Sequence, residues 1–363
     1  MIVSKELLAL LARFLLYKEE NNAMKSKKLL VTALSTLGIL AGVTGCKKPQ
    51  SDVTLSDKKD GFVIGVLQPV EHPALGAAKD GFVEGLTEKL GEGKFTVNYK
   101  NAGGNDADLQ MGAKTLVDGC DMTFGLGTGA ALALKNSAIS KGVTKPVIFS
   151  AVTDPVDAGL VENKDAPEGF VTGSSDMNPV DDQIALIKEI IPTVSKIGIL
   201  YTQSEVNSVV QSNMAKAKAE ALGLSVEVKT CMNTSDISST ADALVKTGVQ
   251  AIFIPTDNNI AANMDAVKNV VDQAHVLVAC GEEGMLKGGG HATLSINYKD
   301  LGKQAGLMAG DILLKNKTIK QSPVKYMTSA ECTYVLSSKN LADAQITIPD
   351  TIMSAHAWSD VDA

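Results

Sequence analysis

The feature that most constrains this chain is a regular alternation of short apolar runs with stretches of helical spacing. Such an alternation is typical of βαβ units, in which parallel strands are buried beneath helices. The chain is therefore expected to form an α/β fold. The spacing predicts strands at 62–67, 95–99, 122–126 and 146–150, and helices at 74–90, 106–117 and 130–139.

The same alternation starts again after residues 171–175, so the chain contains two such units of similar size. After them come a helix at 301–314 and strand-like segments at 324–327 and 345–348. The second unit predicts strands at 196–201, 225–229, 251–255 and 276–280, and helices at 179–191, 207–222, 234–247 and 259–273.

We expect two doubly wound parallel-sheet lobes joined by a hinge. The first lobe covers 61–172, the second covers 173–295, and a returning segment at 296–363 is shared between them. Doubly wound sheets bind ligands outside the carboxyl ends of their strands. The predicted site is therefore a cleft between the lobes, which can close by hinge motion.

Charge and composition exclude several classes of function. The 363 residues carry a net charge of −7 and only 4% aromatic residues, which argues against a nucleic-acid partner. Arg13 is the only arginine, so the rest of the chain has no guanidinium group, which binds phosphate through two parallel hydrogen bonds. The histidines and cysteines show no metal-ligand spacing, and no nucleophile elbow or dinucleotide fingerprint occurs. We therefore expect no metal, no cofactor and no enzymatic activity.

The N-terminal region has the pattern of a processed leader. Residues 24–45 combine a basic start, an apolar stretch and small residues before Cys46, as a signal peptide does, and the apolar stretch is short for a membrane span. Val43-Thr44-Gly45-Cys46 resembles the bacterial lipobox, which predicts a lipidated Cys46; a plain secretory signal is the alternative. Residues 46–60 are expected to form a flexible tether. Residues 1–23 are expected to be an extension before the true start, unless they form an amphipathic helix.

Polar residues follow most of the predicted strands, whereas the strands themselves are apolar. Because the carboxyl ends of parallel strands meet at one edge of a sheet, these residues are expected to face the cleft. The candidate ligand-binding residues are Gln68, Glu71, His72, Thr128, Ser150, Thr153, Asp154, Tyr201, Ser204, Asn207, Ser208, Asp257, Asn258 and Glu282.

Four ordered segments, at 64–75, 147–156, 198–208 and 254–258, resemble a known family. The family is that of the substrate-binding lipoproteins of ABC importers related to the tryptophan-binding type, and the resemblance covers about 61–348. It implies a type I periplasmic-binding fold, capture of a small solute, often an aromatic amino acid, and delivery to a permease with its ATPase. The segment 125–129 is richer in glycine than the Thr-Pro form expected in the family, so the side-chain pocket can differ.

An amino acid would present a carboxylate to this cleft. Without arginine, that carboxylate must be met by hydroxyls and by free N–H groups at helix N-termini. Residues at strand-to-helix turns are suited to this role, although they are equally suited to capping the helices. The candidates are Thr128, Thr153, Ser204, Asn207 and Ser208.

The ammonium group of an amino acid would need carboxylate acceptors. Asp257 is the first choice, followed by Asp154 and Glu71, because a buried carboxylate is expensive unless a cation meets it. The alternatives are that Asp257 caps the helix at 259 and that Asp154 forms a turn before a proline. His72 either caps the helix at 74 or lies along the ligand.

The expected function is that of a monomeric, lipid-anchored solute-binding component of an ABC importer, on the extracytoplasmic face of the cell membrane. It would capture a free amino acid, aromatic or otherwise hydrophobic, by closing its two lobes. One alternative keeps the fold and the transport role with a sugar or nucleoside as the ligand. Another, from a different class, is an α/β enzyme.

Overall fold

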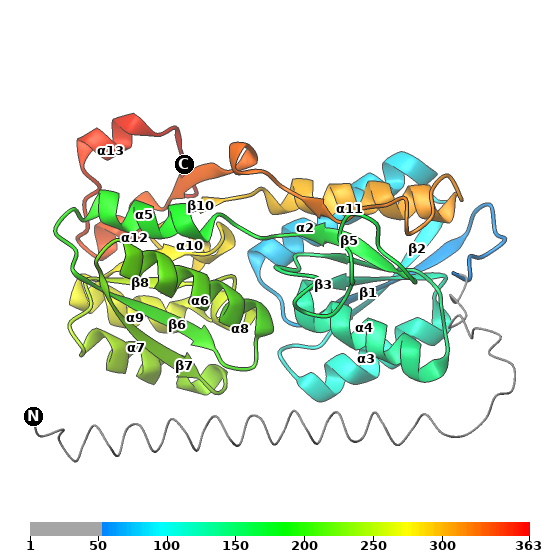
Figure 1. Cartoon of the computed structure of the whole chain (residues 1–363), viewed down its shortest axis with the longest axis horizontal. Helices are drawn as coiled ribbons and strands as arrows, with labels where there is room; N and C mark the ends of the chain where they lie inside the picture. The colour runs from blue at the N-terminus through cyan, green and yellow to red at the C-terminus, as the bar shows by residue number, and fades with distance from the viewer. Residues whose placement is uncertain (1–52) are drawn as a thin grey trace, which may run out of the picture. The chain divides into compact units, whose positions relative to one another are not determined.

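Buried apolar strands form the centre of each lobe in the computed structural model, which describes residues 53–363 (Figure 1). In β1 (Phe62–Gln68) almost every side chain is buried, as parallel strands covered by helices on both faces require. The predicted leader at 24–45, the extension at 1–23 and Cys46 lie outside the described residues. Residues 53–60, expected to belong to the tether, lie against the first lobe, where Thr54 N donates to Thr144 O at 3.1 Å and Lys58 pairs with Asp121 at 2.8 Å.

The first lobe contains a six-stranded sheet in the order β11-β5-β4-β3-β1-β2, parallel throughout. Two apolar clusters cover its two faces. Besides β1, its elements are α2 (Pro73–Leu90), β2 (Phe95–Asn101), α3 (Asp106–Gly119), β3 (Met122–Leu126), α4 (Gly127–Lys141), β4 (Val147–Ser150), β5 (Val171–Ser175), α11 (Tyr298–Leu313) and β11 (Lys325–Tyr326).

The second lobe contains a seven-stranded sheet in the order β13-β12-β10-β9-β8-β6-β7, in which only β10 and β12 are antiparallel. Its elements are α5 (Val180–Ile190), β6 (Lys196–Thr202), α6 (Val206–Ala221), β7 (Ser225–Cys231), α7 (Ile237–Val245), β8 (Ala251–Ile254), α8 (Asn258–Ala261), α9 (Met264–Ala274), β9 (Leu277–Cys280), α10 (Gly284–Gly288), β10 (Ala292–Ser295), β12 (Thr333–Leu336), α12 (Ser338–Asp343), α13 (Asp350–Ala355) and β13 (Trp358–Asp360).

Two expectations about the order of elements differ from the structure. β5 pairs with β4, so the first lobe extends through Ser175 instead of ending at 172. The segment 345–348 is not a strand: Gln345 has a positive φ of 57°, and Ile348 is buried in the second lobe's core as part of a loop. Its alternation of apolar residues reflects burial of that loop, and the edge strands β12 and β13 were missed.

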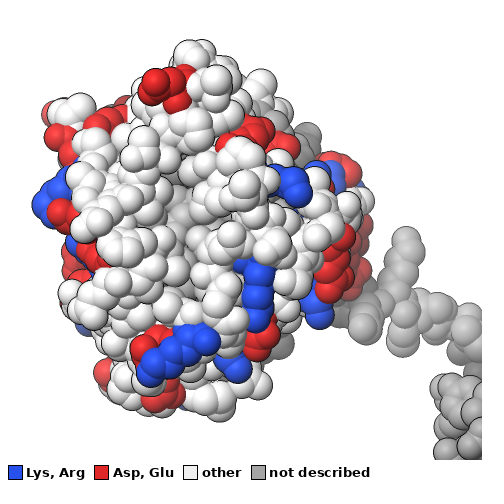
Figure 2. Space-filling view, turned by 90° about the vertical axis from the view of Figure 1, so that its left-hand side faces the viewer, with Lys and Arg blue, Asp and Glu red and all other residues white. Residues whose placement is uncertain are grey.

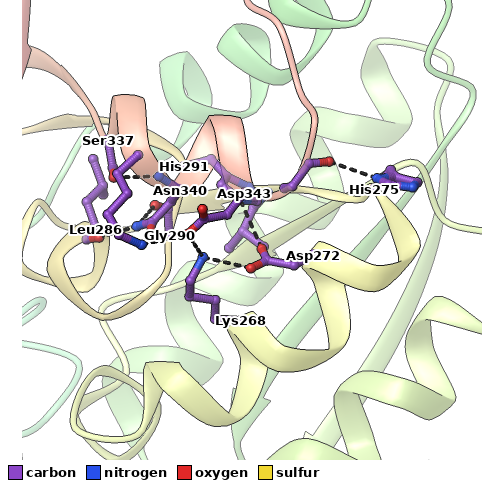
Figure 3. A network of polar contacts seen from close by, with 12 residues as sticks. Lys268, Asp272, His275, Leu286, Gly290, His291, Ser337, Asn340 and Asp343 are labelled. Atoms are coloured by element: carbon purple, nitrogen blue, oxygen red, sulfur yellow. Dashed lines mark hydrogen bonds and ion pairs between the residues drawn. The ribbon is translucent and has the colours of Figure 1, made fainter.

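A polar network fastens the returning segment to the second lobe (Figure 3). Lys268 on α9 pairs with Asp272 at 2.7 Å and with Asp343 on α12 at 3.0 Å. Asn340 on α12 donates to the carbonyl oxygen of Gly290 at 2.9 Å. Since Asp343 and Asn340 lie far along the chain from Lys268 and Gly290, these contacts hold the last part of the chain on the lobe that it left before α11.

Glycines allow α2 and α11 to approach each other closely on the first lobe (Figure 1). A Cβ added to Gly302 would lie 1.9 Å from the carbonyl oxygen of Ala78, and one added to Gly81 would lie 1.9 Å from that of Lys299. Backbone thus meets backbone, and even a methyl group would have to push the helices apart. Since α11 directly follows β10 of the second lobe, this contact holds the returning segment on the first lobe where the chain crosses over.

We predict that Gly302→Ala lowers the free energy of unfolding by roughly 1–3 kcal/mol, because overpacking forces a backbone shift. Denaturant titration would measure it. The matched control is Gly76→Ala on α2, where a Cβ meets nothing within 4 Å. This control should be neutral or stabilising by up to about 1 kcal/mol, since alanine favours a helix over glycine. Equal stability of the two variants would contradict the close contact.

Candidate functional site

Two cavities lie between the lobes, where the carboxyl ends of strands from both sheets meet. The outer cavity has a volume of about 320 Å³ and is lined by both lobes. The inner cavity, of about 10 Å³, is much smaller and shares Asn258 with the outer one. No lysine or arginine is among the described residues that line either cavity.

The first lobe presents an anion-friendly helix end to the outer cavity. Thr128 stands in the first turn of α4, and its buried hydroxyl has no hydrogen-bond partner among residues 53–363. The helix starts without a side-chain cap, so its first N–H groups are also available. Together with the helix dipole, these donors favour a negatively charged group.

The second lobe places a carboxylate, Glu205, in the same cavity. It accepts hydrogen bonds from the backbone N–H of Asn258 at 3.0 Å and of Asn259 at 2.9 Å, and from the side chain of Asn258 at 2.7 Å. Burial, and then the neighbouring Asp257, raises the pKa of Glu205 to about 8. A cation beside it would lower that pKa, and Glu205 is thus suited to receiving one. Sequence reasoning missed this residue, although it falls inside the segment 198–208.

Apolar side chains complete the outer cavity. Val70, Leu109 and Leu132 come from the first lobe, and Val206 and Met232 from the second. Met232 is 67% exposed and stands at the rim. A charged end and an apolar wall in one cavity suit a small amphipathic solute.

The inner cavity contains two buried polar atoms without partners in the described part of the chain. His72 joins the lobes, its Nε2 lying 3.1 Å from Asn258 Oδ1, while its Nδ1 is unpaired. Burial lowers the pKa of His72 to about 4, so the ring is neutral. Glu282 accepts a hydrogen bond from Gly284 N through one oxygen, and its other oxygen, Oε1, is unpaired. Burial above all, together with the charges of Glu283 and Asp176, raises the pKa of Glu282 to about 8 against the lowering effect of the Gly284 N–H.

Asp176 lies on the crossover after β5 and completes the inner cavity. It accepts hydrogen bonds from the Tyr298 hydroxyl at 2.7 Å and from Thr153 Oγ1 at 3.1 Å, and burial raises its pKa. Thr153 Oγ1 also lies 3.2 Å from Thr256 Oγ1 in the other lobe. Sequence reasoning missed Asp176 and Tyr298, because neither follows a strand of the expected second lobe.

Asp257 has a structural role that leaves little room for a ligand. Its carboxylate accepts from Thr202 N at 2.6 Å, Thr202 Oγ1 at 2.9 Å and Ser208 Oγ at 2.9 Å, and caps α8 through Ile260 N at 2.9 Å. The capping alternative therefore describes Asp257, although it does line the inner cavity.

Other candidates divide between the cavities and their surroundings. Thr128, Ser204, Asn207 and Asn258 line the outer cavity; His72, Asp257, Asn258 and Glu282 line the inner one. Thr153 and Ser208 bond to residues that line the inner cavity. Like Thr153 and Ser208, five further candidates line neither cavity: Gln68 bonds to the carbonyl of Val70, Glu71 is exposed, Ser150 accepts from Ser174, Asp154 forms a turn with Val156 and Asp157, and Tyr201 packs against the second lobe's core.

Three further observations concern the exposed end of the second lobe, the helices and the possible metal ligands of the described residues. On the end of the molecule formed by the second lobe, Lys side chains lie next to Asp and Glu around a broad uncharged area (Figure 2). No helix within residues 53–363 is both long and apolar enough to cross a bilayer. Nor do those residues contain a cluster of His, Cys, Asp and Glu that could hold a metal ion.

Two parallel-sheet lobes with a charged cavity between them define a two-lobe solute receptor of the type I periplasmic-binding class. Over residues 63–359 the chain matches the ABC transporter substrate binding protein family, and it belongs to that family. It is therefore a solute-binding component of a transporter and not an enzyme.

Relatives agree with this assignment. The chain is 31% identical to a tyrosine-binding protein of Clostridioides difficile over 85% of this chain and 90% of that one. It is 33% identical to a Streptococcus pneumoniae ABC domain in complex with L-Trp, with a TM-score of 0.76 over 83% of this chain and all of that one. A ligand-free, open substrate binding protein from Clostridium difficile is 30% identical, with a TM-score of 0.60 over 82% of this chain and 99% of that one.

We predict that Asp257→Ala destabilises the protein by roughly 3 kcal/mol, because several buried donors lose their acceptor. Asp154→Ala, which removes a turn carboxylate from a partly exposed site, should cost about 1 kcal/mol or less. Denaturant titration of both variants would measure the difference. Unchanged stability of the Asp257 variant would restore a ligand-binding role to this residue.

We predict that Glu282→Gln removes part of the pH dependence of stability. A pKa of about 8 in the folded protein, against an ordinary 4.5, means that protonated Glu282 stabilises the fold fully below about pH 4.5. This contribution is lost as the pH rises to about 8. The unfolding midpoint of wild type should therefore fall relative to that of the variant between pH 5 and pH 8. Glu92→Gln, at an exposed carboxyl, is the control. Parallel curves of unfolding midpoint against pH for wild type and Glu282→Gln would contradict the burial of the Glu282 carboxyl.

Proposed function

We propose that this protein captures a free amino acid in the outer cavity and delivers it to the permease and ATPase of an ABC importer. The observation that carries the proposal is the pairing, across one cavity, of an unpartnered hydroxyl at an uncapped helix start with a buried carboxylate. An amino acid has the complementary pair of charges a few ångströms apart. Neither the carboxylate nor the ammonium group of the ligand would need an arginine as its binding partner.

The carboxylate of the ligand would bind at the start of α4. Thr128 Oγ1 would donate one hydrogen bond, and the first N–H groups of the helix would donate others. A buried hydroxyl without a partner costs free energy in the empty protein, and the ligand would remove that cost. The glycine at 129 leaves the backbone open at this turn.

The ammonium group would meet buried carboxyls of the second lobe. Glu205 lines the same cavity as Thr128, and its own hydrogen bonds hold it in place without neutralising its charge. A cation that enters the closed cleft gains more from such a carboxylate than it would in water, because the dielectric is lower there.

The side chain of the ligand would lie against the apolar wall formed by Leu109, Leu132, Val206 and Met232. This wall favours a hydrophobic side chain, and the names of the tyrosine- and tryptophan-binding relatives support an aromatic one. No aromatic residue is among the described residues that line the outer cavity, which disfavours the stacking that a sugar or nucleoside would use.

Cys46 is proposed to carry a lipid that holds the monomer on the extracytoplasmic face of the cell membrane. The lipobox-like sequence before Cys46 and the family's role in import support this anchor. Cys46→Ala should abolish incorporation of labelled fatty acid and release the protein from the membrane fraction. Membrane retention of that variant would instead favour a different anchor.

Purified protein should release a bound amino acid on denaturation, identified by mass spectrometry, and should be stabilised by L-tyrosine or L-tryptophan in thermal unfolding. Binding at 100 times the dissociation constant stabilises a protein by about 2.7 kcal/mol. Stabilisation by sugars or nucleosides alone would overturn the amino-acid assignment. Chemical conversion of the added compound would overturn the receptor assignment.

We predict that Thr128→Val weakens binding of that amino acid by about 10-fold to 100-fold, since a hydrogen bond to a charged group is worth about 1.5–3 kcal/mol. Valine keeps the shape of threonine, and stability should change little. Ser140→Ala, near the other end of α4, is the control and should bind as wild type does. Isothermal titration calorimetry would measure both, and an unchanged affinity for Thr128→Val would place the carboxylate elsewhere.

A further inference from the structure

The inner cavity is small, acidic and only partly satisfied. Its volume of about 10 Å³ matches a single water-sized group. Asp176, Asp257 and Glu282 line it, and the described lining residues include no lysine or arginine. Asp257 is satisfied by protein donors, so the unmet acceptors belong to other residues that line the cavity.

Two of those acceptors are buried and unpaired within the described residues. Oε1 of Glu282 has no donor, and neither has Nδ1 of His72. Because the His72 ring is neutral and its Nε2 faces Asn258 Oδ1, a proton on Nε2 would be donated to that oxygen. Nδ1 is then a bare lone pair, and the group that fills the cavity must donate hydrogen bonds to both lobes.

The acidic lining of the inner cavity further limits which chemical group can fill it. A water molecule could donate two hydrogen bonds, but it carries no positive charge, so Glu282 would have to stay protonated beside it. A metal ion is disfavoured, because residues 53–363 offer no cluster of ligands for one. A group with several N–H donors and a positive charge can donate hydrogen bonds to both lobes and also compensate the charge of an ionised carboxylate.

We propose that the inner cavity is an ammonium subsite, in which one NH₄⁺ or R–NH₃⁺ group donates to Glu282 Oε1 and His72 Nδ1 as the lobes close. Asp176, held by Tyr298 and Thr153, would supply the remaining negative charge. Glu282 comes from the second lobe and His72 from the first, so the bound group would join the lobes.

Two sources of the group are distinguishable. One is the α-ammonium of the captured amino acid, with its side chain passing Asn258 into the outer cavity; this version rests on the proposed function and makes Glu282 the acceptor instead of Glu205. The other is a free ammonium ion, bound alongside the solute. The chemistry at the subsite is the same in both.

The first test compares L-tyrosine with 3-(4-hydroxyphenyl)propionate, which lacks the ammonium group, on wild type, Glu282→Gln and the control Glu283→Gln. Glutamine keeps the size of Glu282 and an oxygen for Gly284 N. Glu283 is half-buried and does not line the cavity. If the α-ammonium fills the subsite, Glu282→Gln should lose at least tenfold in affinity for tyrosine and little for the propionate, while Glu283→Gln binds both as wild type does.

The second test uses wild-type protein in ammonium chloride and in sodium chloride at equal concentration, without amino acid. A free ammonium ion at the subsite should raise the thermal unfolding midpoint in ammonium chloride alone, and Glu282→Gln should lose this shift. This measurement does not depend on amino-acid binding, so it still tests the cavity if tyrosine and tryptophan fail to bind. The proposal is overturned if no ammonium-specific shift occurs and Glu282→Gln does not weaken tyrosine binding selectively.

Discussion

Negative charge buried between the two lobes is the constraint on which the rest of this structure depends. Asp176, Glu205, Asp257 and Glu282 all lie at strand ends or crossovers that face the cleft, and burial raises the pKa of each. Isolated buried carboxylates are strongly unfavourable, so each one needs donors, a proton or a cation. How each carboxyl meets that need separates the residues that build the cleft from those that can bind a solute.

Asp257 and Glu282 represent the two outcomes. Asp257 collects donors from β6, α6 and α8 and so ties three elements of the second lobe together. Glu282 has one oxygen on Gly284 N and another without a donor in the described chain. Thr128 shows the same distinction among hydroxyls, since Ser208 donates to Asp257 while Thr128 donates to nothing described. Unmet hydrogen-bonding capacity thus singles out Thr128 and Glu282 as proposed binding groups, whereas Glu205, which already accepts from Asn258 and Asn259, is proposed for its charge and its place in the outer cavity.

This distinction explains what the sequence could and could not predict. The alternation of apolar runs was sufficient to predict two parallel-sheet lobes and a cleft at the strand ends, because a strand that is buried on both faces can be recognised from its own run of apolar residues. The positions after the strands also pointed to Thr128, His72, Asn258 and Glu282, all of which line one of the cavities. These positions could not separate Asp257 from Glu282, because Asp257 is satisfied by Thr202, 55 residues away. Asp176 was missed for a similar reason: its partner Tyr298 lies 122 residues further along the chain.

The same charge explains how a solute can drive closure. A ligand shifts an equilibrium only by its differential affinity for the two states. In an open cleft, water solvates Glu205 and Glu282, and a solute's ammonium gains little there. In the closed cleft, that ammonium replaces the lost water and lies in a low dielectric, so its interaction strengthens as the lobes meet. Without the ammonium group of a solute, closure must bury the carboxyls of Glu205 and Glu282, which can then be neutralised only by taking up protons. On the proposed function, the cleft would therefore close most favourably around a solute that brings a positive charge, and the apolar wall of the outer cavity would select among such solutes.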